Sequence, residues 1–153
     1  MLVTNHVLAG ALLGHVAAGP VSALALGVAS HFVMDAVPHW GGYELRDVLH
    51  IAVADGLVGA TLLVLVAGAT PRERRTKVVA GILGAALPDS DKPWDLFVGG
   101  SPFPRRFDRF HAGIQTESSR RMPQELVVGA TLALAVGRVL VGVSRGSRRT
   151  VIR

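Results

Sequence analysis

The sequence predicts an all-α polytopic membrane bundle of four to five helices, with a long polar loop before the last helix. Half of its 153 residues are hydrophobic but only 5% are aromatic, so the apolar residues are mainly Ala, Val, Leu and Gly. Small residues of this kind allow membrane helices to pack closely. Charged residues make up 18%, fewer than the roughly 25% of an average soluble domain. This composition excludes disorder over most of the chain.

Five apolar runs predict the helices. They cover residues 2–18, 21–37, 48–69, 78–87 and 126–143. Because a bilayer core needs about 20 helical residues, the third and last runs span it comfortably, whereas the first two are short. The run 78–87 is shorter still, and it either recruits the basic residues before it, re-enters the membrane or packs against its neighbours. Small-residue pairs four apart, Gly10 with Gly14 and Gly56 with Ala60, predict helix contacts.

The length fits one domain, which we expect to be a membrane-embedded helical unit over 1–143. Within it, five prolines break the apolar pattern and predict a polar loop at 88–123, and residues 144–153 form a basic tail. The first run lacks a basic segment before it and contains His6 and His15, so we expect it to be retained rather than cleaved as a signal peptide.

The net charge of +5 is distributed between the apolar runs. Basic residues gather in a hinge at 72–77, in the polar loop and in the tail, as in membrane loops that meet lipid headgroups. We expect no nucleic-acid partner, since no aromatic-rich binding motif accompanies the charge. A solvated basic surface is the alternative. The hinge and tail are expected to be cytoplasmic.

A His–Asp–His run at the end of the second helix is the sharpest chemical signal. Residues four apart lie on one helix face, so His31 and Asp35 share a stripe, which His39 continues if the helix survives Pro38. A lone carboxylate at a helix centre in lipid costs about 2.5–3.5 kcal/mol, so Asp35 needs a metal or a partner charge. A hydrogen-bonded network that only joins helices is the alternative.

Three further acids are candidates. Asp89 and Asp91 follow an apolar helix two residues apart, where they can converge on one cation, although a plain turn has the same pattern. Asp55 lies inside the third apolar run and must face the protein interior. Zero cysteines leave His and carboxylate as the ligands of any metal.

His6 and His111 complete the set through topology. Five alternating spans bring both to the side that holds the other candidates, whereas His15 falls elsewhere and is expected to be a packing residue. A lone histidine in either place is otherwise a satisfied core or loop residue.

Four short motifs span most of residues 1–115: Thr4-Asn-His6-Val-Leu-Ala-Gly, His31-x-x-x-Asp35-x-x-Pro-His39, Leu87-Pro-Asp89-Ser-Asp91 and Phe110-His111. Together they resemble the LexA-binding, inner-membrane-associated hydrolases, also called predicted membrane-bound metal-dependent hydrolases. The resemblance implies a multi-pass protein of the inner (plasma) membrane and puts His6, His31, Asp35, Asp89, Asp91 and His111 at motif positions. The chain departs from the pattern at Lys92, where His is expected, and at Phe110-His111-Ala, where Thr-His-Ser is expected. The His-x-x-x-Asp element is also similar to one in zinc phospholipases C, which implies phosphoester substrates.

We therefore expect a membrane-bound metal-dependent hydrolase acting on a phosphoester or lipid-like substrate. The predicted metal ligands are His6, His31, Asp35, His39, Asp89 and Asp91, with catalytic roles for His111 and Asp55. Of these, His31, Asp35, Asp89 and His111 are the strongest candidates to contact the metal, and Asp55 and His39 hold a second metal or orient the ligands. The ion is a divalent metal, with zinc favoured by mixed imidazole and carboxylate ligands.

The expected partners are membrane lipids, with Arg105, Arg106 and Arg109 available to bind anionic headgroups. Two rival functions remain open. A non-enzymatic transporter or metal-binding membrane protein would use the same acids and imidazoles as an ion path. A structural adaptor would bind a partner through the basic hinge and tail.

Overall fold

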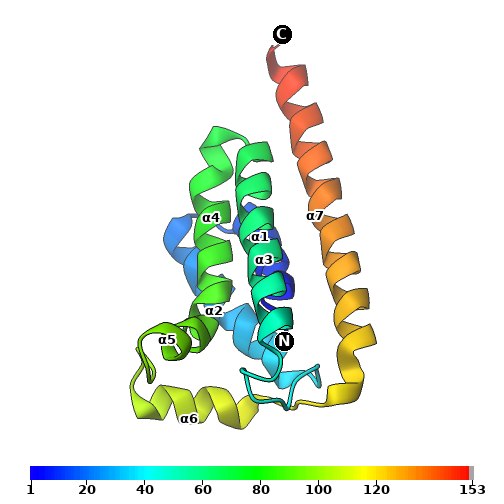
Figure 1. Ribbon diagram of the computed structural model, residues 1–153. Helices are drawn as coiled ribbons and strands as arrows, with labels where there is room; N and C mark the ends of the chain where they lie inside the picture. Colours follow the sequence, from blue (N-terminus) through cyan, green and yellow to red (C-terminus); the bar gives the residue numbers. More distant parts are fainter. Residues whose placement is uncertain (152–153) are drawn as a thin grey trace.

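The computed structural model describes residues 1–151, with side chains up to Val143 (Figure 1). Every regular element in this part of the chain is a helix, which confirms the all-α prediction. The elements are α1 (Val3–Val16), α2 (Pro20–Ala36), α3 (Leu49–Ala69), α4 (Arg72–Ala86), η1 (Leu87–Ser90), α5 (Asp91–Phe97), α6 (Arg105–Ile114), η2 (Ser119–Arg121) and α7 (Met122–Val151). The side chains of the predicted basic tail, 144–153, lie outside the described residues.

α1 is the central helix and packs against α2, α3, α4 and α7. The buried apolar core joins one face of α1 to three of these helices. Its members are Val7, Leu8 and Ala11 of α1, Val66 of α3, Val78 and Ile82 of α4, and Val136 of α7. The core therefore depends on contacts between segments that are far apart in sequence.

Glycines set the close approach of α1 and α2 to α4. A Cβ added at Gly10 would overlap the backbone of Gly81, and a Cβ added at Gly81 would overlap that of Gly10. Gly14 likewise meets the backbone of α4, so the helix contact predicted for Gly10 and Gly14 is confirmed. The contact predicted for Gly56 with Ala60 is wrong, because a Cβ at Gly56 would meet nothing within 4 Å. The space beside Gly56 is therefore not filled by a neighbouring helix.

Prolines and backbone caps fix where the apolar helices begin and end. Pro20 opens α2, where the Gly19 N–H donates to Ser22 Oγ at 3.0 Å. α2 ends at Ala36 because Val37, which precedes Pro38, is extended with φ −75° and ψ 136°. The stripe of His31 and Asp35 therefore stops before His39.

Within the described residues, two helices are long and apolar enough to cross a membrane. They are Leu49–Ala69, with 21 residues and a mean hydropathy of 2.1, and Ser119–Val143, with 25 residues and 2.2. Only 11% and 6% of their most apolar stretches are buried in the protein. α1, α2 and α4 are shorter, so the expectation of four or five spans stays a prediction.

The polar segment 88–123 contains helices and is more ordered than the predicted loop. Pro93 lies in the first turn of α5 and Pro104 directly precedes α6, both positions that a helix tolerates. α6 lies across one end of the bundle, the end that also holds the N-terminus (Figure 1). Four of the five prolines that break the apolar pattern, all except Pro102, thus lie in or next to the first turn of a helix.

Candidate metal centre

Asp35 lies among three histidines from three different helices. Its Oδ2 is 3.2 Å from Nε2 of His31 and 3.1 Å from Nε2 of His111, and its Oδ1 is 3.2 Å from Nε2 of His6. All four side chains are buried. The predicted shared face of His31 and Asp35 is confirmed, and α1 and α6 each add an imidazole to it.

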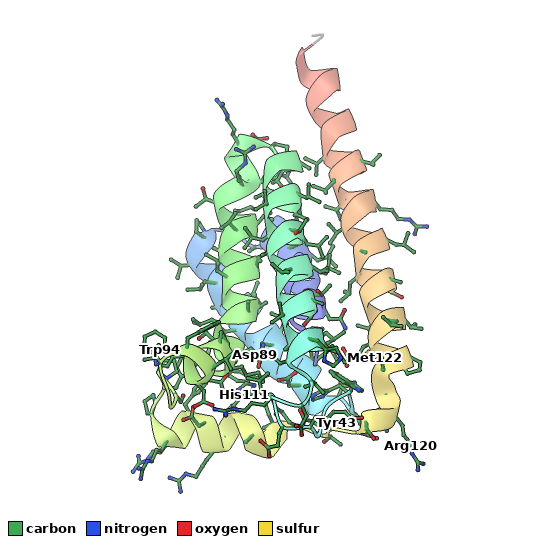
Figure 2. All side chains as sticks on the ribbon, viewed as in Figure 1. Tyr43, Asp89, Trp94, His111, Arg120 and Met122 are labelled. Carbon is green, nitrogen blue, oxygen red and sulfur yellow. The ribbon has the colours of Figure 1, made fainter. Side chains whose placement is uncertain are left out.

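Asp89 brings a second carboxylate to the same point from the turn that follows α4. Its Oδ1 lies 3.9 Å from Nε2 of both His31 and His111. Figure 2 shows Asp89 and His111 close together at the end of the bundle that α6 crosses. One ligand atom from each of His31, Asp35, Asp89 and His111 lies within 4.8 Å of the other three, and these four residues are named here the His/Asp cluster.

The orientation of His31 suits a metal ligand. Its Nδ1 lies 2.8 Å from the carbonyl oxygen of Ala85. Because a carbonyl only accepts, Nδ1 carries a proton, and in the neutral imidazole Nε2, which faces Asp35 and His111, keeps its lone pair for a metal. Metal-ligating histidines commonly donate their other ring N–H to a carbonyl in this way.

Aromatic packing positions His111. Phe32 of α2 makes edge-to-face contacts with Phe107 and Phe110 of α6, with ring centroids 5.9 and 5.3 Å apart. His111 also meets Phe32 edge-on, at 5.8 Å. α6 is thus held against α2 by the same face that carries its histidine, while Arg105, Arg106 and Arg109 are exposed.

The donor atoms of the His/Asp cluster fit a divalent ion. Two imidazole nitrogens and two carboxylate oxygens are ligands that zinc and similar borderline ions accept. Ligand atoms around a four-coordinate zinc, with bonds of about 2.0–2.1 Å, lie about 3.3 Å apart. Five of the six separations in the cluster are 3.0, 3.1, 3.2, 3.9 and 3.9 Å. These values bracket that spacing.

His6 is the unsatisfied member of the group. It is fully buried and stacks on His31, with ring centroids 4.0 Å apart and planes inclined by 24°. Neither ring nitrogen makes a hydrogen bond within the described residues, although Nε2 lies close to Asp35. A buried imidazole without hydrogen bonds is costly, and the contact of His6 that bears on the site is the 3.2 Å approach of its Nε2 to Asp35 Oδ1.

Lys92 pairs with the cluster from α5. Its Nζ donates to Asp89 Oδ1, the same oxygen that faces the two histidines. Burial opposes ionisation of Asp89, but Lys92 together with His6 and His31 holds the pKa of this carboxyl below its ordinary value. Burial also favours neutral Lys92, and attraction to Asp89 outweighs it and raises the pKa of the ammonium. Asp89 and Lys92 therefore form a charged pair at the edge of the cluster.

Besides His6, which stacks on His31, three predicted site residues lie outside the His/Asp cluster. His39 Nδ1 bonds the Val37 carbonyl at 2.9 Å, and its Nε2 lies 3.8 Å from Glu117. Asp91 accepts the backbone N–H of Lys92 at 2.8 Å, and burial raises the pKa of its carboxyl.

Asp55, the third of them, caps α1. Its carboxylate accepts the backbone N–H groups of Val3 at 2.6 Å and Thr4 at 3.1 Å. This places Asp55 against the protein interior, as expected for an acid in an apolar helix. Its contacts are those of a helix cap that fixes the start of α1, three residues before His6.

Two polar residues near the site were not among the candidate site residues predicted from sequence. Gln115 Nε2 lies 3.1 Å from Asp35 Oδ2 and 3.2 Å from His111 Nε2, and its spacing of four from His111 is the signal that sequence offers. Glu125 is buried and accepts from the Leu2 N–H, the Asn5 amide and the Trp40 N–H. It joins α7 to α1 and to the segment after α2.

Comparison of the chain with protein-family models, curated proteins and solved structures found no match.

Proposed function

We propose that this protein is a membrane-bound metal-dependent hydrolase whose divalent ion, zinc by the nature of its ligands, is held by the His/Asp cluster. The observation that carries the proposal is the convergence of four buried ligand atoms from α2, η1 and α6. An ion held by such ligands acts as a Lewis acid and makes a water-derived nucleophile available near neutral pH. The sequence resemblance to metal-dependent hydrolases supports the same reaction class.

Some side chains at the site would bind the ion, and others orient those ligands. Asp35 provides the central negative charge, and Gln115 bonds the same oxygen that faces both cluster histidines. The Ala85 carbonyl fixes the ring of His31. Because each of these groups already has a partner that restricts its rotation, little ordering remains to be done when a ligand arrives.

Lys92 gives the site a preference for anionic substrates. Its ammonium pairs with Asp89 at the cluster while the side chain as a whole is 46% exposed, so Lys92 can reach a group that approaches from outside. A phosphoester carries negative charge that increases as its bond to the leaving group breaks, and a fixed ammonium stabilises such charge. This favours a phosphoester over a neutral ester as the substrate.

The proposal includes a membrane bundle with five spans. Large apolar side chains remain exposed around the bundle, on α2, α3 and α7 in particular; they include Val21, Val33, Leu57, Val64, Leu65, Leu126, Val127 and Leu134. Contact with lipid accounts for this apolar surface without a protein partner. α6, with phenylalanines on one face and arginines on the other, would lie at the membrane surface at the end that holds the cluster.

Turnover by the purified protein tests the proposal. The protein is reconstituted with Zn²⁺ in a mild detergent and assayed on bis(p-nitrophenyl) phosphate, a water-soluble phosphodiester. His111→Ala should lower turnover by roughly two or more orders of magnitude, because the variant loses a cluster ligand. His15→Gln is the matched control, since His15, in α1, is buried like His111 but lies outside the cluster.

Equal loss of turnover in both variants would point to general damage and contradict the assigned site. No turnover by the metal-loaded wild type, combined with metal uptake by vesicles that contain the protein, would favour the transporter instead.

A further inference from the structure

A large apolar cavity adjoins the His/Asp cluster. Its volume is about 610 Å³, and it lies between the start of α1, the segment after α2, α3, the end of α4 and α5. Its walls are mainly aliphatic and aromatic, with Val53, Leu63, Ile82, Leu96, Phe97 and Trp40 among them. A volume in this range is typical of pockets that enclose a small organic ligand, about 300–1,000 Å³.

The charged groups of the cavity have distinct positions and partners. Asp89, Ser90 and Lys92 line the part that touches the cluster. The other two lining acids are occupied by backbone donors, Asp55 by the first turn of α1 and Glu117 by the N–H of Gly42 at 2.9 Å. Lys92 is thus the side-chain cation that the described cavity wall offers to a ligand.

The cavity and the cluster share the Asp89–Lys92 pair. Lys92 pairs with the Asp89 oxygen that lies 3.9 Å from Nε2 of His31 and of His111, so a divalent ion that used this oxygen would compete with the ammonium. When that oxygen serves the ion, the ammonium is free to pair with an anionic group that enters from the cavity. The apolar wall begins beside it, with Pro93 and Leu96 on the next turn of α5.

We infer that the substrate is a single-chain amphiphile with an anionic phosphate headgroup, whose chain occupies this cavity and whose phosphate pairs with Lys92. This inference rests on the proposed function and deepens it by naming the substrate class. The apolar wall favours the chain through burial, and the ammonium selects the charged headgroup. An aqueous substrate without a chain would leave the cavity unused.

Gly56 offers a way to fill the cavity without disturbing the helix. It lines the cavity, and a Cβ added there meets nothing within 4 Å. Gly56→Phe therefore places a ring into the space meant for the chain. Gly68→Phe is the matched control, because Gly68 lies on the same helix, also has open space around its Cβ, and does not line the cavity.

Trp40 lines the cavity and reports on its occupancy. The second tryptophan, Trp94, is replaced by Phe so that only Trp40 fluoresces. The protein in lipid nanodiscs is titrated with 10-bromodecyl phosphate, whose bromine quenches tryptophan at short range, and with the neutral 10-bromodecanol. We expect saturable quenching by the phosphate, weakened about tenfold or more by Gly56→Phe and unchanged by Gly68→Phe.

Lys92→Gln should weaken quenching by the phosphate while leaving quenching by the alcohol nearly unchanged. Equal quenching in the two glycine variants, or equal effects of Lys92→Gln on both probes, would overturn the inference. Metal content of Gly56→Phe checks that the cluster is intact, and Ala52→Phe, at another lining position, repeats the test if Gly56→Phe does not fold.

The proposed function and the inference fail separately. Saturable chain binding that depends on Gly56 and Lys92, without hydrolysis of any phosphoester, would contradict the hydrolase function and support the ligand site. If Gly56→Phe and the wild type hydrolyse a chainless phosphodiester at equal rates and neither shows saturable chain binding, the hydrolase function is supported and the amphiphilic substrate is contradicted.

Discussion

The ammonium of Lys92 pairs with the Asp89 oxygen that lies 3.9 Å from both cluster histidines. A cation bound by the cluster therefore meets both repulsion and competition from Lys92.

Lys92→Gln should bind Zn²⁺ more tightly, by about tenfold, because removal of one nearby positive charge is worth about 1 kcal/mol or more at a partly buried site. Competition with a chromophoric chelator measures the affinity. Arg109→Gln serves as the control, since Arg109 is exposed on α6 and bonds the Arg105 carbonyl instead of the cluster. Weaker zinc binding by Lys92→Gln would mean that the lysine supports the site.

Asp55→Asn should lower stability and leave metal binding intact. The carboxylate caps α1 through Val3 and Thr4, and the loss of a charged cap costs about 1–2 kcal/mol. A detergent-phase thermal melt together with metal analysis separates the two effects. Loss of metal in Asp55→Asn at unchanged melting temperature would instead assign this acid to the site.

The crossing of α1 and α4 predicts a severe effect from one methyl group. Gly81→Ala places a Cβ against the backbone of Gly10, so the helices must separate, at a cost of about 1–3 kcal/mol. Gly137→Ala, where an added Cβ meets nothing within 4 Å, should be neutral or slightly stabilising. Similar melting temperatures for the two variants would contradict the close packing described here.

Helix positions were predictable from sequence because long apolar runs carry the signal locally. The fourth helix was predicted to cover only the apolar run 78–87. It begins earlier, at Arg72, because polar residues with good helix propensity extend it. The segment 88–123 was expected to be a loop, because prolines that open helices and prolines that break them look alike without structure.

The site was predictable only in part, because some of its residues come together through contacts between segments that are far apart along the chain. His31 and Asp35 share a helix face, so their spacing was sufficient. His111 joins them through the packing of α6 on Phe32, which is a long-range contact. His39 lies outside the cluster because Val37 is extended before Pro38 and ends the helix. Lys92 was not predicted as a site residue, and it lies at the site because its ammonium pairs with Asp89.

The proposed five-span arrangement predicts that the hinge between α3 and α4 and the segment between α5 and α6 lie on opposite sides of the membrane. The chain has no cysteine, so single cysteines introduced at Glu73 and Ser101, both exposed, report their own side. A membrane-impermeant maleimide applied to intact cells should label Ser101→Cys and spare Glu73→Cys if the hinge is cytoplasmic. Labelling of both from the same side would contradict the bundle orientation.

The metal content of the purified protein tests the central claim most directly. Elemental analysis after dialysis in mild detergent should find about one divalent ion per chain in the wild type and in His15→Gln, because the cluster is preformed by the fold. Asp35→Asn and His111→Ala, which each remove one of the four cluster ligands, should retain less than about a tenth of that amount while their helical circular dichroism is unchanged. A wild type without metal after reconstitution, or an Asp35→Asn variant with its full complement, would contradict the metal centre.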